Sequence, residues 1–382
     1  MRTSSLLLAA ALLTGCIFED PMPSRGKPRQ DCGRPPSEES GGSGTEAGTT
    51  VYIAAVRFPE SYDWQTDSAR GTAEYEVLLL KDSVVRLTVP SSTGMVSPDP
   101  DTHHIIGGHL YTEAVKDGAT VVCMDGEMLF SFAGHEILKG LLPCEDGVYT
   151  LSMSRDGGSL VLRRDGNPLL ERKGAAAFGD LLDPSYGSTG ALYKDGEDVC
   201  FSYSTGNGSG KSCHIVRGTM ESLVCDGDGI SDLKMSGGTV LTAKSRMGPY
   251  SIEDGRIWRG ADGPWISGHF TRSGYEGFSG LLSPDFEDRR LCSRKATVYH
   301  SEGYDAAAVS SAAGTRIVQP DGKTDFVPGR FLMTPVCAVA RGRFFAALSS
   351  RSSDTQTVVA GERTFTLELH GYLSGIEVSL PR

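Results

Sequence analysis

Residues 121–130, "VVCMDGEMLF", consist of two apolar runs separated by a tight polar turn at Asp125 and Gly126. An Asp-Gly pair between two such runs is a strong sign of a β-hairpin, because both residues tolerate the positive φ angles that a tight turn requires. The same arrangement of apolar strand, polar turn and apolar strand recurs along the chain. Its other instances are "LLLKDSVVRL" (78–87), "LVLRRDGNPLL" (160–170), "CHIVRGTMESL" (213–223), "YSIEDGRIW" (250–258), "RIVQPDGKTDF" (316–326) and "TVVAGERTFTL" (357–367).

The spacing of these hairpins indicates a repeat architecture. The turns begin at Asp82, Asp125, Asp165, Arg217, Asp254, Asp321 and Ala360. Most of the spacings fall near the roughly 40–45 residues of one four-stranded propeller blade. A second set of strands keeps the same phase upstream of turns two to five: "HLYTEAVKDG" (109–118), "GVYTLSMSRDGG" (147–158), "DVCFSYSTGNG" (198–208) and "TVLTAKSRMG" (239–248).

We therefore predict an all-β fold, a β-propeller in which seven four-stranded blades are favoured over six or eight. Helical periodicity is almost absent after residue 50, and the competing interpretation is a pair of β-sandwiches. The interval between the turns at Asp254 and Asp321 is long enough for an extra blade or a long loop. Rings of this kind close by pairing the two chain ends in one blade, and residues 51–58 ("VYIAAVRF") and 375–382 ("GIEVSLPR") are the predicted partners.

The N-terminus predicts export. Arg2 precedes an apolar run over 6–13 that is too short for a membrane-spanning helix, which needs roughly 20 residues. It has the proportions of a signal peptide. The run ends in "LTGC" (13–16), which resembles the lipobox of bacterial lipoproteins; this resemblance implies cleavage before Cys16, acylation of its thiol with fatty acids such as palmitate, and anchoring in the membrane.

Three residues after Cys16 extend this resemblance. Ile17 replaces the Asp that retains such lipoproteins in the inner membrane, so we expect sorting to the outer membrane. Glu19 and Asp20 resemble the short acidic export tags of surface lipoproteins from gut Gram-negative bacteria. We therefore predict a lipid-anchored protein on the cell surface or on the periplasmic face of the outer membrane.

The next stretch is rich in Pro, Gly, Ser and charge, a composition that buries too little apolar surface to offset the entropy of ordering. The predicted organisation is a signal peptide over 1–15, the lipidated cysteine and a disordered tether over 16–49, and the propeller over 50–382.

Composition excludes several partners. The formal net charge is −11, whereas nucleic-acid binding needs clustered Lys and Arg. None of the nine cysteines has CxxC spacing, which argues against zinc and thioredoxin-like sites.

We expect a monomer with no cofactor. Cys200 and Cys213 flank one hairpin and are the candidate disulfide in an exported protein.

Candidate ligand-binding residues fall into two groups, and no catalytic residue is assigned. Asp99, Asp101, His103 and His104 form the densest group of titratable side chains in the chain, although adjacent histidines on a strand point to opposite faces. Tyr62, Trp64, Trp258 and Trp265 are aromatic residues that would suit stacking on sugar rings.

The stretch "CDGDGISDL" (225–233) resembles an acidic calcium loop, with Asp226, Asp228 and Asp232 separated by glycines. The repeat places it between the last strand of one blade and the first strand of the next. We interpret it as a connection rather than a metal site, with Asp232 in the strand.

Three functions agree with these features. The first is a non-catalytic propeller that binds or scaffolds a glycan or a surface protein. The second is a propeller glycosidase or lyase with carboxylates in the central channel. The third is an accessory of surface fimbriae, because "GCIFED" followed by Cys32 resembles the start of fimbrial-anchor lipoproteins.

Overall fold

The chain divides into two compact units, Met1–Gly42 and Ser43–Arg382, and the second contains all the residues described below. The computed structural model describes residues 50–63, 74–79, 84–90, 103–134, 136–154, 158–178, 189–206, 211–226, 229–260, 263–285, 289–293, 297–301, 304–321, 323–331, 336–340, 342–350, 353–361 and 363–379. All regular structure in these ranges is β-strand, and none of it is a helix long and apolar enough to cross a membrane.

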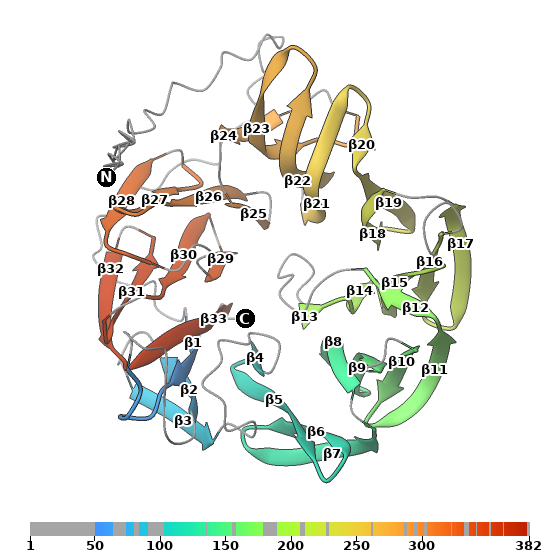
Figure 1. Cartoon of the computed structure of the whole chain (residues 1–382), viewed down its shortest axis with the longest axis horizontal. Helices are drawn as coiled ribbons and strands as arrows, with labels where there is room; N and C mark the ends of the chain where they lie inside the picture. The colour runs from blue at the N-terminus through green and yellow to red at the C-terminus, as the bar shows by residue number, and fades with distance from the viewer. Residues whose placement is uncertain are drawn as a thin grey trace, which may run out of the picture. The chain divides into compact units, whose positions relative to one another are not determined.

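The second unit is a seven-bladed β-propeller, as predicted (Figure 1). Blade 1 contains β33 (Gly371–Ser379), β1 (Thr50–Arg57), β2 (Glu74–Leu79) and β3 (Val84–Pro90); blade 2 contains β4 (His103–Ile106), β5 (His109–Lys116), β6 (Ala119–Met124) and β7 (Glu127–Ala133). Blade 3 contains β8 (Glu136–Cys144), β9 (Gly147–Ser154), β10 (Ser159–Arg164) and β11 (Asn167–Lys173), with β13 (Thr189–Gly190) paired to β8. Blade 4 contains β12 (Ala175–Ala177), β15 (Asp198–Thr205), β16 (Ser212–Arg217) and β17 (Met220–Asp226), with β14 (Tyr193–Asp195) paired to β15.

The remaining blades follow in chain order. Blade 5 contains β20 (Arg246–Met247), β21 (Tyr250–Gly260), β22 (Gly263–Arg272), β23 (Tyr275–Leu282) and β24 (Arg289–Ser293). Blade 6 contains β25 (Thr297–Ser301), β26 (Tyr304–Ser310), β27 (Gly314–Val318) and β28 (Thr324–Pro328); blade 7 contains β29 (Val336–Ala340), β30 (Arg343–Leu348), β31 (Thr355–Ala360) and β32 (Arg363–Glu368). Between blades 4 and 5 lies a separate sheet whose described strands are β18 (Ile230–Ser236) and β19 (Thr239–Lys244); both strands were predicted, but as part of the blade with the turn at Asp254.

The Asp-Gly turns have the predicted role in blades 2 and 3. Asp125 and Asp165 have φ angles of 52° and 49°. The backbone N–H of Asp125 donates to the carbonyl of Leu110 over 2.8 Å, and its carboxylate accepts from the N–H of Leu110 over 2.9 Å. Asp165 forms the same two bonds with Val148. The aspartate therefore ties the outer hairpin of each blade back to its second strand.

The other predicted turns have different outcomes. Those at Arg217, Asp321 and Ala360 join the outer strands of blades 4, 6 and 7, and Asp82 lies outside the described residues. The turn predicted at Asp254 is wrong, because β21 continues through it with a register shift between Glu253 and Arg256.

Gly255 explains this difference. A Cβ on Gly255 would lie 2.8 Å from the Oγ of Ser231 on β18. The glycine therefore permits close approach of two sheets, a use of glycine that also occurs within strands.

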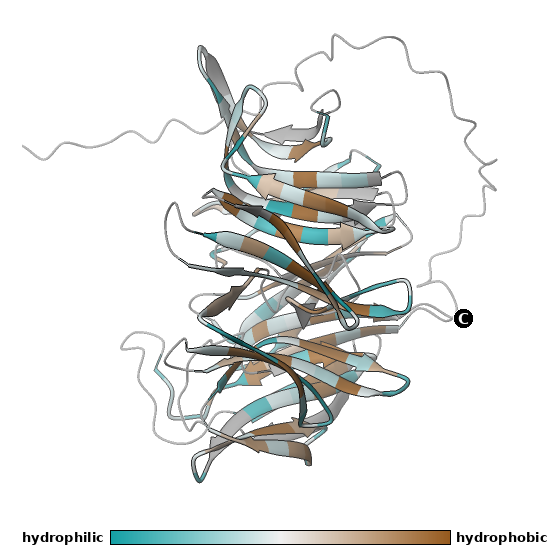
Figure 2. Cartoon of the chain, turned by 90° about the vertical axis from the view of Figure 1, so that its right-hand side faces the viewer, coloured by the Kyte–Doolittle hydropathy of each residue, from teal (hydrophilic) through white to brown (hydrophobic). Residues whose placement is uncertain are grey.

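The hydrophobic core lies between neighbouring sheets rather than at the centre of the ring. Apolar and polar residues alternate along many strands (Figure 2). One cluster joins β1 and β2 to blade 7 through Val51, Ile53 and Phe345, and another joins blades 3 and 4 through Leu151 and Phe201. Trp258 and Trp265 are buried between blades 5 and 6, so they belong to the core and not to a sugar-binding surface.

The chain ends close the ring as predicted. β1 pairs with both β33 and β2, with Ile53 opposite Ile376 and Arg57 opposite Gly371. The apolar contacts of blade 1 with blades 2 and 7 therefore depend on both chain ends.

Candidate functional site

Exposed apolar side chains gather on the outer strands of three consecutive blades. Among the described residues, seven large hydrophobic side chains are exposed, and five of them lie on β7, β11 and β17. They are Met128 (65% exposed), Leu129 (37%), Leu169 (51%), Met220 (66%) and Leu223 (60%). We call these five residues the apolar rim.

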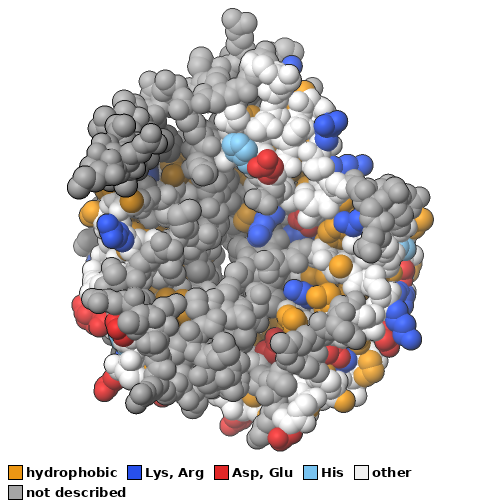
Figure 3. All heavy atoms as spheres, in the orientation of Figure 1, with side chains coloured by type: hydrophobic (Ala, Val, Ile, Leu, Met, Phe, Trp, Pro, Cys, Tyr) orange, Lys and Arg blue, Asp and Glu red, His pale blue; other side chains and the backbone are white. Residues whose placement is uncertain are grey.

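The three strands of the apolar rim are neighbours in space. They follow one another along the outside of the ring in Figure 1. A Cβ on Gly166, in the turn before β11, would lie 3.1 Å from the Cβ of Phe130 on β7. β11 is joined to β17 by Arg172, whose Nε donates to Glu221 over 2.8 Å. Hydrophobic and charged side chains are interspersed along the right-hand rim of the ring in Figure 3.

Glu221 lies at the centre of a polar cluster beside Leu223. Its carboxylate accepts hydrogen bonds from both Nε and Nη2 of Arg172 and from the Tyr203 hydroxyl. The Nδ1 of His214 lies 3.3 Å from Glu221 Oε1, and the His214 ring stacks on Tyr203 with centroids 4.8 Å apart. We call these four residues the Glu221 cluster.

The electrostatics of the Glu221 cluster favour a structural role. Burial raises the pKa of Glu221, but the hydrogen bonds from Arg172 and Tyr203 outweigh it and the net shift is downward. Burial, together with the bond to Glu221, raises the pKa of Tyr203 to about 12. A carboxylate held ionised and a phenol held protonated are poor proton-transfer groups near neutral pH. The cluster instead fixes β11 and β17 beside each other.

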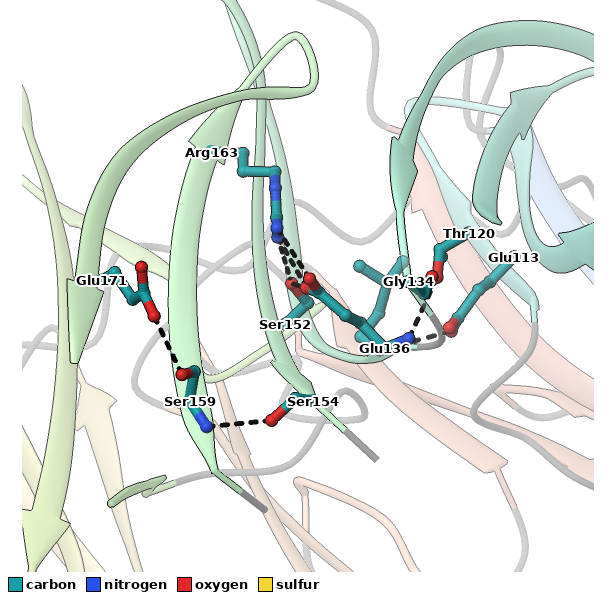
Figure 4. A network of polar contacts seen from close by, with 10 residues as sticks. Glu113, Thr120, Gly134, Glu136, Ser152, Ser154, Ser159, Arg163 and Glu171 are labelled. Atoms are coloured by element: carbon teal, nitrogen blue, oxygen red, sulfur yellow. Dashed lines mark hydrogen bonds and ion pairs between the residues drawn. The ribbon is translucent and has the colours of Figure 1, made fainter. Parts of the chain in front are cut away.

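A second polar network is buried between blades 2 and 3 (Figure 4). The guanidinium of Arg163 donates to both oxygens of Glu136 over 2.7 Å and to the hydroxyl of Ser152 over 2.7 Å. The N–H of Glu136 donates to the Thr120 hydroxyl of blade 2, and the Arg163 guanidinium lies 4.0 Å above the ring of Phe132. Because Arg163, Glu136 and Ser152 are all buried, this network joins the two blades and offers no accessible carboxylate.

A third polar group joins the two-stranded sheet to blade 5. Asp232 Oδ2 accepts from the backbone N–H of Ile257 over 2.9 Å, and the Nζ of Lys234 lies 3.4 Å from the Ile257 carbonyl. The two side chains are 3.7 Å apart and both are buried. Burial raises the pKa of Asp232 to about 6 and lowers the pKa of Lys234.

The residues predicted to bind a ligand are not brought together among the described parts of the chain. Tyr62 packs against Phe58 and His370, with ring centroids 4.1 and 6.0 Å away. His103 and His104 are consecutive on β4, opposite Thr112 and Tyr111, and His104 is buried. Trp64, Asp99 and Asp101 lie outside the described residues, so their role as ligand contacts stays a prediction.

The predicted Cys200–Cys213 bridge is not formed. Cys200 on β15 lies opposite Arg217, whereas Cys213 on β16 lies opposite Ser204. This offset of four positions corresponds to about 13 Å along the strand. A disulfide needs Cα atoms within about 7 Å. Cys200 has a free thiol in the structure, and the register partner of Cys213 on its other side is Cys225.

The acidic stretch 225–233 covers the end of β17 and the start of β18, so it joins two strands as we interpreted it. β17 ends at Asp226 and β18 begins at Ile230, so Asp232 belongs to a strand and its carboxylate bonds backbone N–H groups. In the described part of the chain, no group of three or more His, Cys, Asp or Glu side chains is placed to hold a metal ion.

The apolar rim was missed at the sequence level, although its strands were predicted. Its residues lie in the hairpin repeats 121–130, 160–170 and 213–223. An apolar residue in such a hairpin is predicted to be buried in the core. The rim residues are exposed because β7, β11 and β17 lie at the outside of the ring. The signal available in the sequence is that apolar residues follow the turns on both faces, as in Met128 and Leu129.

Comparison with known proteins assigns no family. No protein-family model and no curated protein sequence matches the chain. Among solved structures, apo AztD from Citrobacter koseri is similar at 10% identity with a TM-score of 0.47, over 87% of this chain and 98% of that one. The β-propeller domain of the Trilobed protease from Pyrococcus furiosus is similar at 10% identity with a TM-score of 0.44, over 85% and 93%. At this identity the likeness gives no ligand or activity.

Proposed function

We propose that the chain is a non-catalytic, lipid-anchored propeller that binds a protein through the apolar rim. The observation that carries this proposal is the gathering of five exposed hydrophobic side chains on three adjacent outer strands. Exposed apolar side chains favour protein association, because their burial removes them from water. The Glu221 cluster supports the same role, since it holds β11 and β17 in fixed relative positions before a partner binds.

The chemistry of the apolar rim favours a protein over a glycan. Its members are Met and Leu, and Phe326 on β28 is the one aromatic residue among the exposed large hydrophobic side chains of the described ranges. Sugar rings stack on exposed aromatic faces, whereas Met side chains adapt to irregular protein surfaces.

Site-specific photo-crosslinking in cells tests the proposal. A photoreactive amino acid at Leu169 or Leu223 should give an adduct with one and the same protein, which mass spectrometry identifies. The same amino acid at Phe326, equally exposed but on blade 6, should not give that adduct. Adducts that are absent, or that are identical at all three positions, would count against the proposal.

Lipid anchoring at Cys16 is a separate part of the proposal. Cys16→Ala should move the protein from the membrane fraction to the soluble fraction, because each acyl CH₂ contributes about 0.8 kcal/mol of membrane affinity and no other lipid site is proposed. Incorporation of a clickable palmitate analogue should be lost as well. A variant that stays membrane-bound and labelled would contradict anchoring at this residue.

A further inference from the structure

The sheet between blades 4 and 5 has two described strands, β18 and β19. Its β18 side contributes Ile230 and Leu233 to a cluster with Phe178 and Cys213 of the blade 4 region. Its β19 side contributes Ala243 to a cluster with residues of blade 5. The other seven sheets contain four or five strands among their described residues.

The outer edge of β19 offers backbone groups for a further strand. Gly237 and Gly238 form a two-residue turn, with Ser236 opposite Thr239, Met235 opposite Val240 and Leu233 opposite Thr242. In a hairpin with such a turn, hydrogen-bonded and non-hydrogen-bonded pairs alternate from the closing pair outward. The N–H and C=O groups of Val240 and Thr242 therefore point away from β18. Among the described strands, β19 pairs with β18 alone.

One exposed apolar side chain, Met220 on β17, lies on the side of blade 4 that faces the two-stranded sheet. Glu221 on β17 contacts Arg172 of blade 3, so the alternating residues Met220 and Ser222 lie on the opposite face, toward β18 and β19. Met220 is 66% exposed, because the described strands of the two-stranded sheet do not extend far enough to cover it.

We propose that an extended segment of a partner protein pairs with β19 and completes this sheet as its third strand. Backbone bonds to Val240 and Thr242 would give affinity, and alternate apolar side chains of the segment would contact Met220. Lys244, the last residue of β19, and Arg246 on β20 are exposed, which favours an acidic residue in the segment at that point. The inference rests on the proposed protein-binding function and names the form in which the partner binds.

Selection from a phage-displayed library of random twelve-residue peptides on the full chain tests this inference. The selected peptides should alternate apolar and polar residues. Their affinity should fall at least tenfold for Val240→Pro/Thr242→Pro, because proline lacks the N–H that an added strand needs at these two outward-facing positions. The matched control, Val240→Ala/Thr242→Ala, keeps both N–H groups and should bind within about twofold of the wild type.

A second readout does not depend on the folding of the proline variant. Binding of a selected peptide to the wild type should slow amide hydrogen exchange at Val240 and Thr242 more than at the edge of β28. Peptides that bind the proline variant equally well, protection elsewhere, or self-association of the chain through β19 would each overturn the inference. Adducts at Leu169 and Leu223 without any proline-sensitive peptide would refute the inference and leave the proposed function standing. Proline-sensitive peptide binding without adducts at Leu169 and Leu223 would refute binding through the apolar rim and leave the inference about β19 standing.

Discussion

Replacement of Asp232 by Ala is expected to lower the free energy of unfolding by about 3–5 kcal/mol, the cost of removing one partner from a buried ion pair. Asp232 accepts the backbone N–H of Ile257 and lies 3.7 Å from Lys234, and both side chains are buried. The variant would leave the N–H of Ile257 without its acceptor and the side chain of Lys234 without its nearby carboxylate. Urea-induced unfolding followed by tryptophan fluorescence measures the change.

Two further variants separate this explanation from simple loss of packing. Asp232→Asn/Lys234→Met keeps an oxygen acceptor for the Ile257 N–H and removes both charges, so it should recover most of the lost stability. Lys244→Ala changes an exposed lysine of the same sheet and should have no measurable effect. A double variant as unstable as Asp232→Ala would contradict the ion-pair explanation.

The pH dependence of stability offers a check on Asp232 with a defined sign. Its folded-state pKa is raised from 3.8 to about 6, so the native state binds the proton more tightly than the unfolded state does. The contribution of this group is therefore fully present below pH 4 and falls by about 3 kcal/mol as the pH rises through 6. Relative to Asp232→Asn, which keeps Lys234, the wild type should lose stability between pH 4 and 6. A constant difference between the two proteins over this range would contradict the assignment.

Replacement of Arg163 by Ala is the second large effect, again about 3–5 kcal/mol of unfolding free energy. The guanidinium forms a bidentate pair with Glu136, both residues are buried, and the variant would leave the Glu136 carboxylate without a counter-charge between blades 2 and 3. Arg163→Lys keeps the charge but loses the two parallel bonds, so it should fall between the wild type and Arg163→Ala.

The adjacent residue provides the control for Arg163. Arg164 pairs with Asp146 over 3.1 Å at the surface, and Arg164→Ala should leave stability unchanged within error, because exposed ion pairs contribute little. Arg163→Met/Glu136→Gln removes both charges and should restore much of the stability lost in Arg163→Ala. Equal effects of the changes at Arg163 and Arg164 would mean that burial of the pair is not what stabilises this boundary.

Local turn chemistry and chain-end pairing could be predicted from the sequence because both depend on residues close in sequence or on simple strand patterns. Asp125 and Asp165 form the expected outer turns, and residues 51–57 pair with 371–379 in blade 1. Asp254 and Gly255 show the limit of this reasoning. An Asp-Gly pair fits both a hairpin turn and a close approach within a strand, and the choice depends on Ser231 of the neighbouring sheet.

The candidate site was harder to predict than the fold. Leu169 and Leu223 have the hydrophobicity of core residues, and their exposure follows from the position of β11 and β17 at the outside of the ring, which a repeat length does not give. The contacts of Asp232 and Lys234 with Ile257 could not be predicted either, because Ile257 lies on a different sheet. The predicted role of Cys16 depends only on local residues, and it stays a prediction.

The central claim is tested most directly by measuring how tightly variants of the apolar rim bind the purified partner protein that the crosslinking experiment identifies. Leu169→Ser/Leu223→Ser should weaken binding at least tenfold, or about 1.4 kcal/mol, as expected when buried contacts at the centre of an interface are removed. Phe326→Ser, which changes an exposed side chain on blade 6, should bind like the wild type. Binding that is unchanged in Leu169→Ser/Leu223→Ser, or weakened equally in Phe326→Ser, would contradict the claim that the apolar rim is the protein-binding surface.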